Sequence, residues 1–354
     1  MLRIKKIDQL SNHHRILMII SFLTIGVILI SGYLLVRQHN PVNVMVEMLI
    51  GSFGSKYRIS STINYAIPLI TTALGISVAF KMRFWNIGAE GQILTGAIFA
   101  TYVALNYSTL PKVALLLIML IAGFIGGALY GMIAALLKIN FNTNETIITL
   151  MLNYISLSWV GFLQYEAWKD PNSLGFPKIP SFSQAARLPR IVNINSGIVI
   201  SILIGLFVYY FLKYSKKGFE ISVIGESENT AKYAGMNIDK NTLLIMLISG
   251  GICGMVGFIQ SSGSVNTLTV SLTMGVGYTA IIIAWLSNLD VKYTFIIGFL
   301  FAIMTQGGHY LESAIGLHYN SVSVIQAFIL FLALTFKFFM NYQLVRTVRS
   351  EHTC

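Results

Sequence analysis

Long apolar segments alternate with short polar segments along almost the whole chain. A helix needs about 20 apolar residues to cross the hydrocarbon core of a membrane. Ten segments approach this length, at 16–36, 63–80, 87–106, 113–137, 145–165, 195–212, 242–261, 276–289, 293–307 and 322–340. The third and the eighth are short or interrupted by glycine. The pattern predicts an all-α polytopic membrane protein in which residues 1–354 form one transmembrane domain of about ten transmembrane helices.

The first apolar segment, 16–36, is longer than the hydrophobic part of a secretory signal, and no small-residue cleavage site follows it. We therefore expect an uncleaved N-terminal span. With ten crossings both termini lie on one side of the membrane, and most basic residues between the spans then fall on that side. The excess of Lys and Arg in cytoplasmic loops predicts an N-in, C-in topology.

Composition agrees with a membrane protein and excludes a nucleic-acid-binding one. Hydrophobic residues make up 55% of the chain and charged residues 10%, whereas a soluble domain carries roughly 25% charged residues. The formal net charge of +11 is spread between apolar segments and forms no single patch, so we expect no nucleic-acid partner.

Two loops are longer than a simple connection. Residues 166–194 are polar and proline-rich, and the topology places them outside the cell. Residues 213–241 are charged and predicted to be cytoplasmic. Within them, Ser227 or Asn229 is expected to cap a short helix that Gly235 ends.

The chain has the outline of an inverted repeat. Crossings two to five (63–165) and seven to ten (242–340) have similar lengths and spacing, and five crossings separate their starts, so the halves would run in opposite directions. Each half has a glycine-containing second span, "NIGAEGQ" in one and "MGVGYTA" in the other. Paired helix breaks in inverted halves indicate a transport site at the midplane; the alternative is two unrelated glycine-rich helices. The predicted break positions are Gly88, Gly91, Gly275 and Gly277.

Glu90 is a carboxylate at the mouth of an apolar segment. A charged side chain that faces lipid at the bilayer centre costs about 2.5 kcal/mol or more, so Glu90 is expected to face protein or water. Asn86 and Gln92 can satisfy the backbone groups that a broken helix leaves free. Two interpretations stay open: these side chains line a solute path, or they tie this span to its neighbours.

Other intramembrane polar groups extend the candidate path. Asn153 lies deep in its segment, where interhelical hydrogen bonding and solute contact are equally compatible with the sequence. Asn144 and Glu145, at a span start, are expected to cap a helix. The complete set of predicted path residues is Asn86, Glu90, Gln92, Asn153, Gln260 and Gln306.

Glycines at four-residue spacing form smooth helix faces in two further segments. Gly123, Gly127 and Gly131 share one face, and Gly250 and Gly254 share another. Such faces allow helices to pack closely. We expect them to be packing seams.

Several signatures are missing from the sequence. It contains no G-x-x-x-x-G-K-[ST] loop, no nucleophile–base set, no metal-ligand spacing and no row of intramembrane acids and bases. Active transport would therefore draw its energy from a partner, and we expect no cofactor or metal in this chain. A secondary carrier working alone is the competing class.

Four ordered phrases resemble the permeases of ABC importers for nucleosides and simple sugars. "FWNIGAEGQ" is similar to the F-N-I-G-A-E-G-Q of the nucleoside branch, with Trp85 inserted, and "NETIITLMLNYI" matches N-E-x-I-x-T-x-M-L-N-Y-I. "GFEISVIGESENTAKYAGMNI" resembles the family's cytoplasmic loop, and "GVGYTAIIIAWLSNLD" a later span whose terminal G-R-x-x-P is absent here. The resemblance covers about residues 60 to 340.

The resemblance implies a non-catalytic permease in a bacterial plasma membrane that forms half of a path for nucleosides. Its implied partners are a second, homologous permease, ABC ATPase subunits that bind ATP and Mg²⁺, and an extracellular substrate-binding (lipo)protein. The 213–241 loop would couple to the ATPase through Gly218, Gly225, Glu226, Asn229, Ala231, Tyr233, Ala234 and Gly235. A ribose-like sugar importer is the alternative within the class, and Glu90 within G-A-E-G-Q argues against it.

Overall fold

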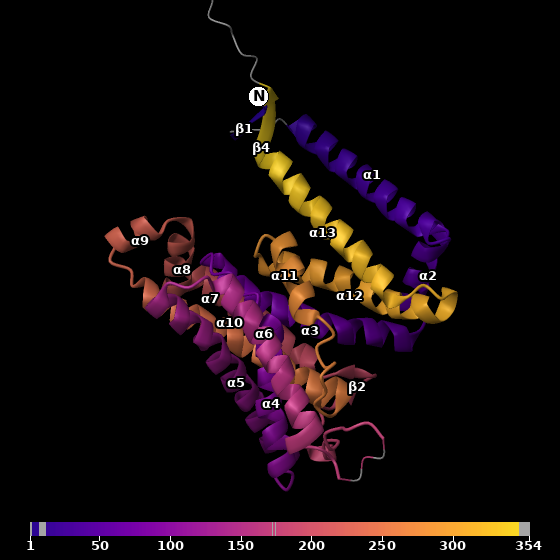
Figure 1. Ribbon diagram of the computed structural model, residues 1–354, viewed down its shortest axis with the longest axis vertical. Helices are drawn as coiled ribbons and strands as arrows, with labels where there is room; N and C mark the ends of the chain where they lie inside the picture. Colours follow the sequence, from indigo (N-terminus) through magenta and orange to yellow (C-terminus); the bar gives the residue numbers. More distant parts are fainter. Residues whose placement is uncertain (1, 7–11, 172, 174, 347–354) are drawn as a thin grey trace, which may run out of the picture. The chain divides into compact units, whose positions relative to one another are not determined.

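The computed structural model describes residues 2–6, 12–171, 173 and 175–346 and is mostly helical (Figure 1). The chain divides into two compact units. The central unit is Ser55–Ile303, and the terminal unit combines Met1–Gly54 with Met304–Cys354. Helix α12 (Val291–Ile315) begins in the central unit and ends in the terminal unit.

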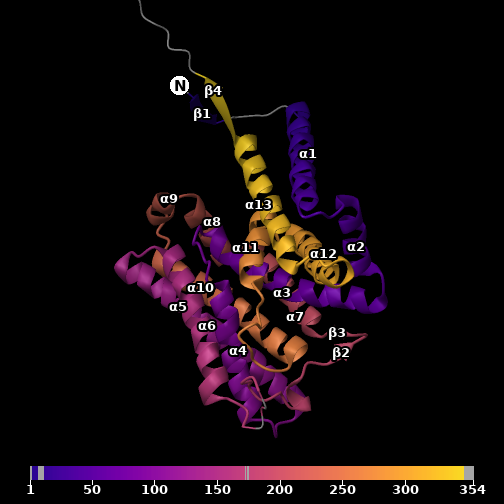
Figure 2. The same cartoon turned by 45° about the vertical axis from the view of Figure 1, so that its right-hand side comes forward.

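The central unit is a helical bundle with a small hairpin. Its helices are α3 (Lys56–Lys81), α4 (Ala89–Asn106), α5 (Lys112–Phe141), α6 (Glu145–Phe162), α7 (Gly197–Tyr214), α8 (Lys216–Glu226), α9 (Glu228–Tyr233), α10 (Ile238–Gln260) and α11 (Val276–Leu286). A π-helical turn extends α6 over Leu163–Ala167, another extends α10 over Ser261–Val265, and a 3-10 turn spans Gln184–Ala186. The hairpin pairs β2 (Arg190–Ile191) with β3 (Ile194–Asn195) (Figure 2).

The terminal unit brings the two ends of the chain together. It contains α1 (Asn12–Val36), α2 (Pro41–Phe53), α13 (Tyr319–Asn341) and an antiparallel pair of strands, β1 (Leu2–Lys6) and β4 (Tyr342–Arg346). Leu2 lies opposite Arg346 in this pair. A hydrophobic core around Leu34, Val44 and Leu311 holds the helices together.

Close packing of α4, α5 and α10 forms the centre of the bundle (Figure 1). A Cβ atom on Gly127 would overlap the Gly250 carbonyl, and one on Gly96 would overlap the backbone of Gly254. Glycine is therefore required where these helices cross, because any side chain would force the backbones apart. The predicted packing seams are confirmed.

All ten predicted apolar segments fall on helices. Among the described residues, six helices are long and apolar enough to cross a membrane: α3, α5, α6 with its turn, α7, α10 with its turn, and α12. The pair α1–α2, bent by 97°, would make a seventh. In contrast, α4 begins with polar residues and α11 has only 11 residues. The count of ten crossings and the N-in, C-in orientation therefore stay predictions.

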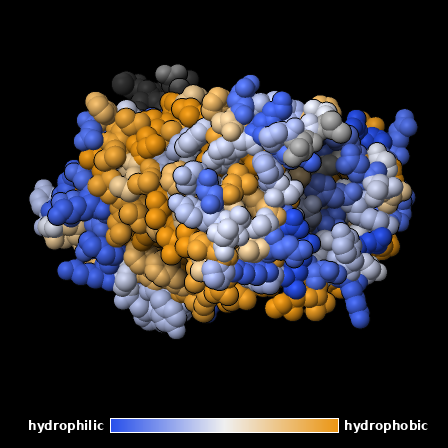
Figure 3. Space-filling model, turned by 90° about the horizontal axis from the view of Figure 1, so that it is seen from below, coloured by the Kyte–Doolittle hydropathy of each residue, from blue (hydrophilic) through white to orange (hydrophobic). Residues whose placement is uncertain are grey.

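The surface of the bundle is apolar over wide areas, as a lipid environment requires. Exposed Leu and Ile side chains follow α5, including Leu117, Ile121, Ile125 and Leu129. Apolar side chains also gather in broad patches on the face seen in Figure 3. Hydrophilic regions interrupt these patches.

The predicted cytoplasmic loop contains two helices. Ser227 caps α9, with its Oγ accepting a hydrogen bond from the Thr230 N–H at 3.3 Å. Gly235 follows the helix at φ +73°, a left-handed conformation that glycine adopts without strain. The short capped helix was predicted correctly. The sequence did not indicate α8 or, in the terminal unit, α2.

Candidate functional site

Two amides bind each other where α3 connects to α4. Asn86 Nδ2 donates to Gln92 Oε1 (3.1 Å) and to Ser249 Oγ (3.0 Å), and Gln92 Nε2 donates back to Asn86 Oδ1 (3.1 Å). The same Asn86 oxygen accepts from the Gly88 N–H at 3.0 Å. Both amides are buried. Their hydrogen-bonding groups are thus taken up by the break itself and by α10.

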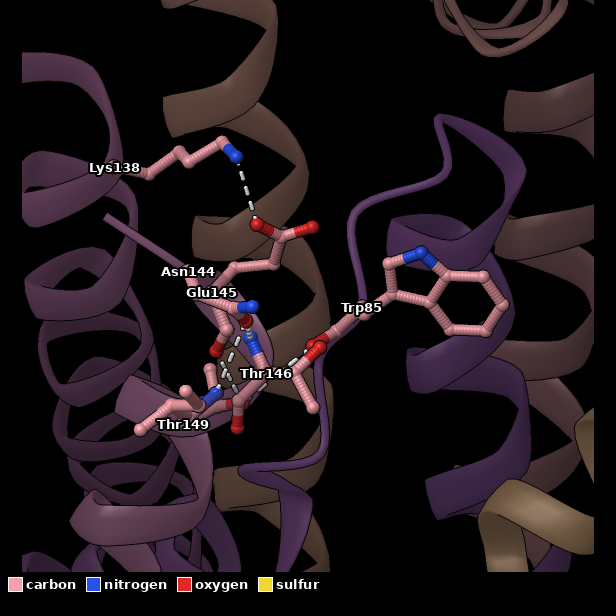
Figure 4. Close-up of polar contacts among 7 residues, drawn as sticks. Trp85, Lys138, Asn144, Glu145, Thr146 and Thr149 are labelled. Carbon is pink, nitrogen blue, oxygen red and sulfur yellow. Dashed lines mark hydrogen bonds and ion pairs between the residues drawn. The ribbon is translucent and has the colours of Figure 1, made fainter. Parts of the chain in front are cut away.

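Polar side chains of α6 satisfy the remaining backbone groups of this break. Asn153 Oδ1 accepts from the Gly91 N–H (2.8 Å), and Asn153 Nδ2 donates to the Ile87 carbonyl (2.9 Å). Thr149 Oγ1 accepts from the Ile87 N–H at 3.2 Å and lies beside the Trp85 carbonyl (Figure 4). Asn153 therefore makes interhelical hydrogen bonds, one of the two roles that the sequence allowed.

The start of α6 has the predicted capping. Asn144 Oδ1 accepts from the N–H groups of Thr146 and Ile147, and the Glu145 carboxylate forms an ion pair with Lys138 Nζ at 2.8 Å (Figure 4). An anion also stabilises a helix N-terminus. Asn144 and Glu145 are accounted for by local structure.

Glu90 joins the two glycine-containing segments. Its Oε1 accepts from the Gly275 N–H (3.1 Å) and its Oε2 from the Gly277 N–H (2.7 Å), and the residue is only 8% exposed. These amides begin α11, where the first N–H groups of a helix have no partner within the helix. The carboxylate at the start of α4 therefore caps the short helix α11.

The breaks lie just before the helices. Gly88 precedes α4, and Gly275, at φ +78°, precedes α11. Gly91 and Gly277, which were predicted as break positions, lie inside the first turns. Their role is close approach: a Cβ on Gly277 would lie 2.5 Å from the Glu90 nitrogen and 2.6 Å from its Oε2.

A cavity of about 350 Å³ opens next to this contact. We call it the Gln260 cavity. It is lined by Tyr57, Ser60, Ser61, Asn64, Tyr65, Pro68, Arg190, Asn193, Gln260, Gly263, Ser264, Val265, Leu272, Thr273, Met274 and Val276. Leu272, Thr273, Met274 and Val276 border the cavity, and Gly275, whose N–H donates to Glu90, lies between them in the sequence. The cavity wall and the Glu90 contact thus share one segment.

The cavity is lined by both polar and apolar side chains and is almost uncharged. Arg190 is the one charged side chain in its lining, and its Nη2 donates to the Gly263 carbonyl at 2.9 Å. Asn64 is also engaged, because it donates to the Asn193 carbonyl and accepts from the Asn195 N–H. Gln260 differs: it is 7% exposed and its Oε1 is buried without a hydrogen-bond partner among the described residues.

Sequence reasoning found Gln260 but missed the other lining residues. Tyr57, Ser61, Asn64 and Pro68 recur at intervals of three or four residues on α3, which places them on one helix face. This polar stripe was the available signal. Arg190 could not be found in the same way, since the fold brings its hairpin to α3 and no local pattern indicates it.

Gln306, the remaining predicted path residue, belongs to the terminal unit. Its Nε2 donates to the Gly51 carbonyl at 3.3 Å. Within that unit it connects α12 to α2. The structure therefore groups Asn86, Glu90, Gln92 and Asn153, brings Gln260 to the neighbouring cavity, and gives Gln306 a separate contact.

The predicted coupling residues divide into a buried base and an exposed tip. Gly218, Gly225 and Ala231 are buried, and a Cβ on Gly225 would overlap the Lys81 carbonyl. Glu226, Asn229, Ala234 and Gly235 are exposed, and Tyr233 is 94% exposed. The glycines pack α8 against the bundle, whereas α9 presents its side chains to the surroundings.

Trp85 and Trp285 stack on each other at the ends of α3 and α11, with ring centroids 5.2 Å apart and ring planes 17° from parallel. Phe80 contacts both rings. No group of three or more His, Cys, Asp or Glu side chains within the described part of the chain is arranged to hold a metal ion.

Comparison with known proteins identifies the family. Residues 58–335 match the family described as the permease component of the branched-chain amino acid transport system. The chain belongs to this permease family. The chain is 31% identical to the glucose ABC transporter permease protein TsgB13 of Haloferax volcanii over 86% of this chain and 83% of that protein.

Two further relatives are nucleoside-system permeases. The guanosine ABC transporter permease protein NupP of Bacillus subtilis is 29% identical over 74% of this permease and 75% of its own length. The nucleoside ABC transporter permease protein NupB of Lactococcus lactis subsp. cremoris is 27% identical over 86% of this permease and 87% of its own length. The resemblance found in the sequence is confirmed.

Family membership settles the broad function. The protein is the multi-pass membrane permease subunit of an ABC importer, and it is not itself an enzyme because ATP hydrolysis belongs to a separate subunit. The family also implies an ATPase and a substrate-binding protein as partners.

Proposed function

We propose that this permease forms half of the path for nucleosides in an ATP-driven importer of a bacterial plasma membrane. A second, homologous permease would supply the other half. The nucleoside-system relatives support this substrate class. The observation that carries the proposal is the Gln260 cavity. Its mixed polar and apolar lining, with Tyr57 and Tyr65 and with Arg190 as its one charged side chain, suits a neutral solute that has both an aromatic face and hydroxyl groups.

The residues predicted to line the path take two roles in this proposal. Gln260 contacts the solute. Asn86, Glu90, Gln92 and Asn153 hold the break before α4 and the start of α11 in place, so they shape the path without touching the solute. This assignment rests on their hydrogen bonds, which are directed at protein groups.

The proposed topology has ten crossings with both termini in the cytoplasm, and its halves 63–165 and 242–340 are inverted. In this orientation α8 and α9 face the cytoplasmic ATPase, which would bind ATP and Mg²⁺, while the permease itself needs no cofactor. The exposed side chain of Tyr233 on α9 is the proposed contact, since tyrosine is often important at protein interfaces. The binding protein would approach from the opposite side, near residues 166–194.

A simple-sugar importer is the second candidate. The 31% identity to a glucose permease favours it, and a cavity that carries hydroxyl and amide groups and little charge also suits a sugar. A carrier that works without an ATPase is excluded by family membership.

Uptake by cells distinguishes the two substrate classes. A strain that lacks this permease is compared with the same strain carrying it on a plasmid, using labelled adenosine, guanosine, ribose and glucose. We expect permease-dependent uptake of nucleosides, and excess unlabelled nucleoside should compete where ribose does not. Permease-dependent uptake of a free sugar in preference to every nucleoside would overturn the substrate assignment.

The proposed ATPase contact is tested by Tyr233→Ala. We expect uptake to fall by about tenfold or more, as for the loss of an interface hot spot of about 2 kcal/mol, while the amount of permease in the membrane stays unchanged. Tyr107→Ala is the control, because Tyr107 is also exposed but lies on the opposite, predicted external side. Equal uptake by both variants would remove Tyr233 from the interface.

A further inference from the structure

Gln260 is a buried residue whose amide oxygen has no hydrogen-bond partner among the described residues. It is the last residue of α10, and the chain then continues into the π-helical turn Ser261–Val265. Its Oε1 is buried and has no partner in the described part of the chain. Burying an amide oxygen without a hydrogen bond is unfavourable. The Gln260 side chain also borders the cavity, so rotation of its amide would let a molecule bound there supply the missing partner.

A second glutamine of the central unit shows the usual arrangement. Gln164 Nε2 donates to the Pro177 carbonyl and its Oε1 accepts from the Val270 N–H, both at 3.1 Å. Both ends of that amide are used to hold loops together. Gln260 has the same side chain but borders the cavity instead.

The cavity restricts the chemistry of the molecule. Its described lining contains no acidic side chain, and its one cation, Arg190, already donates to a backbone carbonyl. A cationic solute would find no counter-charge there. A neutral solute would find hydroxyl groups, tyrosine rings and the Gln260 amide, whose rotation about its last torsion can present either its oxygen or its NH₂ group.

We infer that Gln260 is a solute-recognition residue that binds a neutral solute through adjoining donor and acceptor groups. A nucleobase edge and a pair of sugar hydroxyl groups both supply this chemistry. The inference rests on the proposed function in taking nucleosides as probes. It goes further by giving the Gln260 contact its chemistry, a paired donor and acceptor, so that the permease itself selects the solute in addition to any selection by the binding protein.

Thermal stability separates recognition from a structural role. Gln260→Leu removes an amide that the solute-free protein does not use, so the melting temperature of the purified permease should be unchanged or higher. Gln164→Leu is the matched control and should lower it, because two hydrogen bonds are lost. A fall in melting temperature for Gln260→Leu as large as for Gln164→Leu would overturn the inference.

Solute binding is measured directly with a thiol reporter. Ser264 is an exposed residue of the lining, and Cys253 is fully buried, so Ser264→Cys in a Cys354→Ser background is the accessible reporter. Nucleosides should slow its alkylation by a membrane-impermeant maleimide. Adding Gln260→Leu should raise about tenfold the nucleoside concentration needed to slow alkylation by half. A reporter at the exposed residue Phe176, which does not line the cavity, should show no protection.

The choice of probe identifies the source of the hydrogen bonds. If Gln260 binds the base, then Gln260→Leu should not weaken protection of the reporter by a purine nucleoside that lacks exocyclic groups. If Gln260 binds the sugar hydroxyl groups, then Gln260→Leu should not weaken protection by the deoxynucleoside. Equal protection of the reporter with and without the Gln260 amide overturns the inference. A different result is that cells take up no nucleoside while a free sugar protects the reporter only when the Gln260 amide is present. That pair of results would overturn the nucleoside assignment and leave the role of Gln260 intact.

Discussion

Two buried polar sites of the central unit lie side by side and differ in how their hydrogen bonds are used. Around Glu90, both carboxylate oxygens, both Asn86 atoms and both Asn153 atoms bind protein groups. At Gln260, the amide oxygen has no partner within the described residues. Both sites contain the residue types that sequence reasoning assigns to a solute path.

The difference teaches how to interpret polar residues inside a membrane protein. A polar group whose hydrogen bonds all go to a break in a helix stabilises that break. A buried amide left unpaired next to a cavity is available for a solute. In the proposed assignment, the polar residues around Glu90 are the framework of the solute path and Gln260 contacts the solute.

The largest effect is expected for Glu90→Ala. The variant leaves the amides of Gly275 and Gly277 without partners, and hydrogen bonds to charged groups contribute about 1.5–3 kcal/mol each. We expect the free energy of unfolding to fall by about 3 kcal/mol and uptake to fall with it. Denaturation of the purified permease and cell uptake measure the two quantities. Glu90→Gln, which keeps one acceptor, should lie between. Loss of uptake with unchanged stability would instead place Glu90 among the solute ligands.

A smaller effect is expected for Gly277→Ala, with Gly275→Ala as its matched partner. The Cβ at position 277 would overlap Glu90, and overpacking costs about 1–3 kcal/mol. At position 275 there is open space, so only the left-handed backbone opposes alanine, at about 1 kcal/mol. Melting temperatures should fall more for Gly277→Ala. The reverse order would mean that backbone conformation, and not the approach of Glu90, controls the start of α11.

The smallest effect is expected at a polar cluster that is partnered but close to solvent. Glu220 accepts from Lys217 Nζ (2.6 Å) and Asn241 Nδ2 (2.9 Å), and these bonds lower the pKa of the Glu220 carboxyl below its ordinary value. A lowered pKa stabilises the folded state above the unfolded-state pKa, near 4.3, and this contribution disappears as the pH falls through the folded-state pKa.

Glu220→Gln tests this pH dependence. The variant should be slightly less stable than the wild type at pH 7 and should converge with it in acid, as measured by melting temperature against pH. A difference that grows as the pH falls would contradict the assigned hydrogen bonds.

Local signals in the sequence predicted local structure. The caps at Asn144 and Ser227, the stop at Gly235 and the glycine seams at Gly127 and Gly250 depend on neighbouring residues or on one helix face, and the structure contains them all. The ten apolar segments also fall on helices, because the length and hydrophobicity of a segment are local properties of the sequence. The helix α2 was missed because its 13 residues are too few to cross a membrane, which was the criterion for predicting helices.

Contacts between distant segments could be anticipated only in part. The inverted halves predicted that both glycine-containing segments matter, but nothing in the sequence indicates that Glu90 binds amides 185 and 187 positions away. The position of Arg190 beside α3 likewise depends on tertiary packing. Free and occupied amides cannot be distinguished from the sequence, since Gln92 and Gln260 are the same residue type in similar apolar surroundings.

The antiparallel pairing of β1 with β4 has a consequence for the whole polypeptide. Leu2 lies opposite Arg346, so the path of the backbone nearly closes on itself. A closed path crosses any plane an even number of times. The pairing therefore supports the proposed topology, which has an even number of membrane crossings. A short linker between the ends should also give circular permutants, and new termini opened between helices would report which compartment each connection faces.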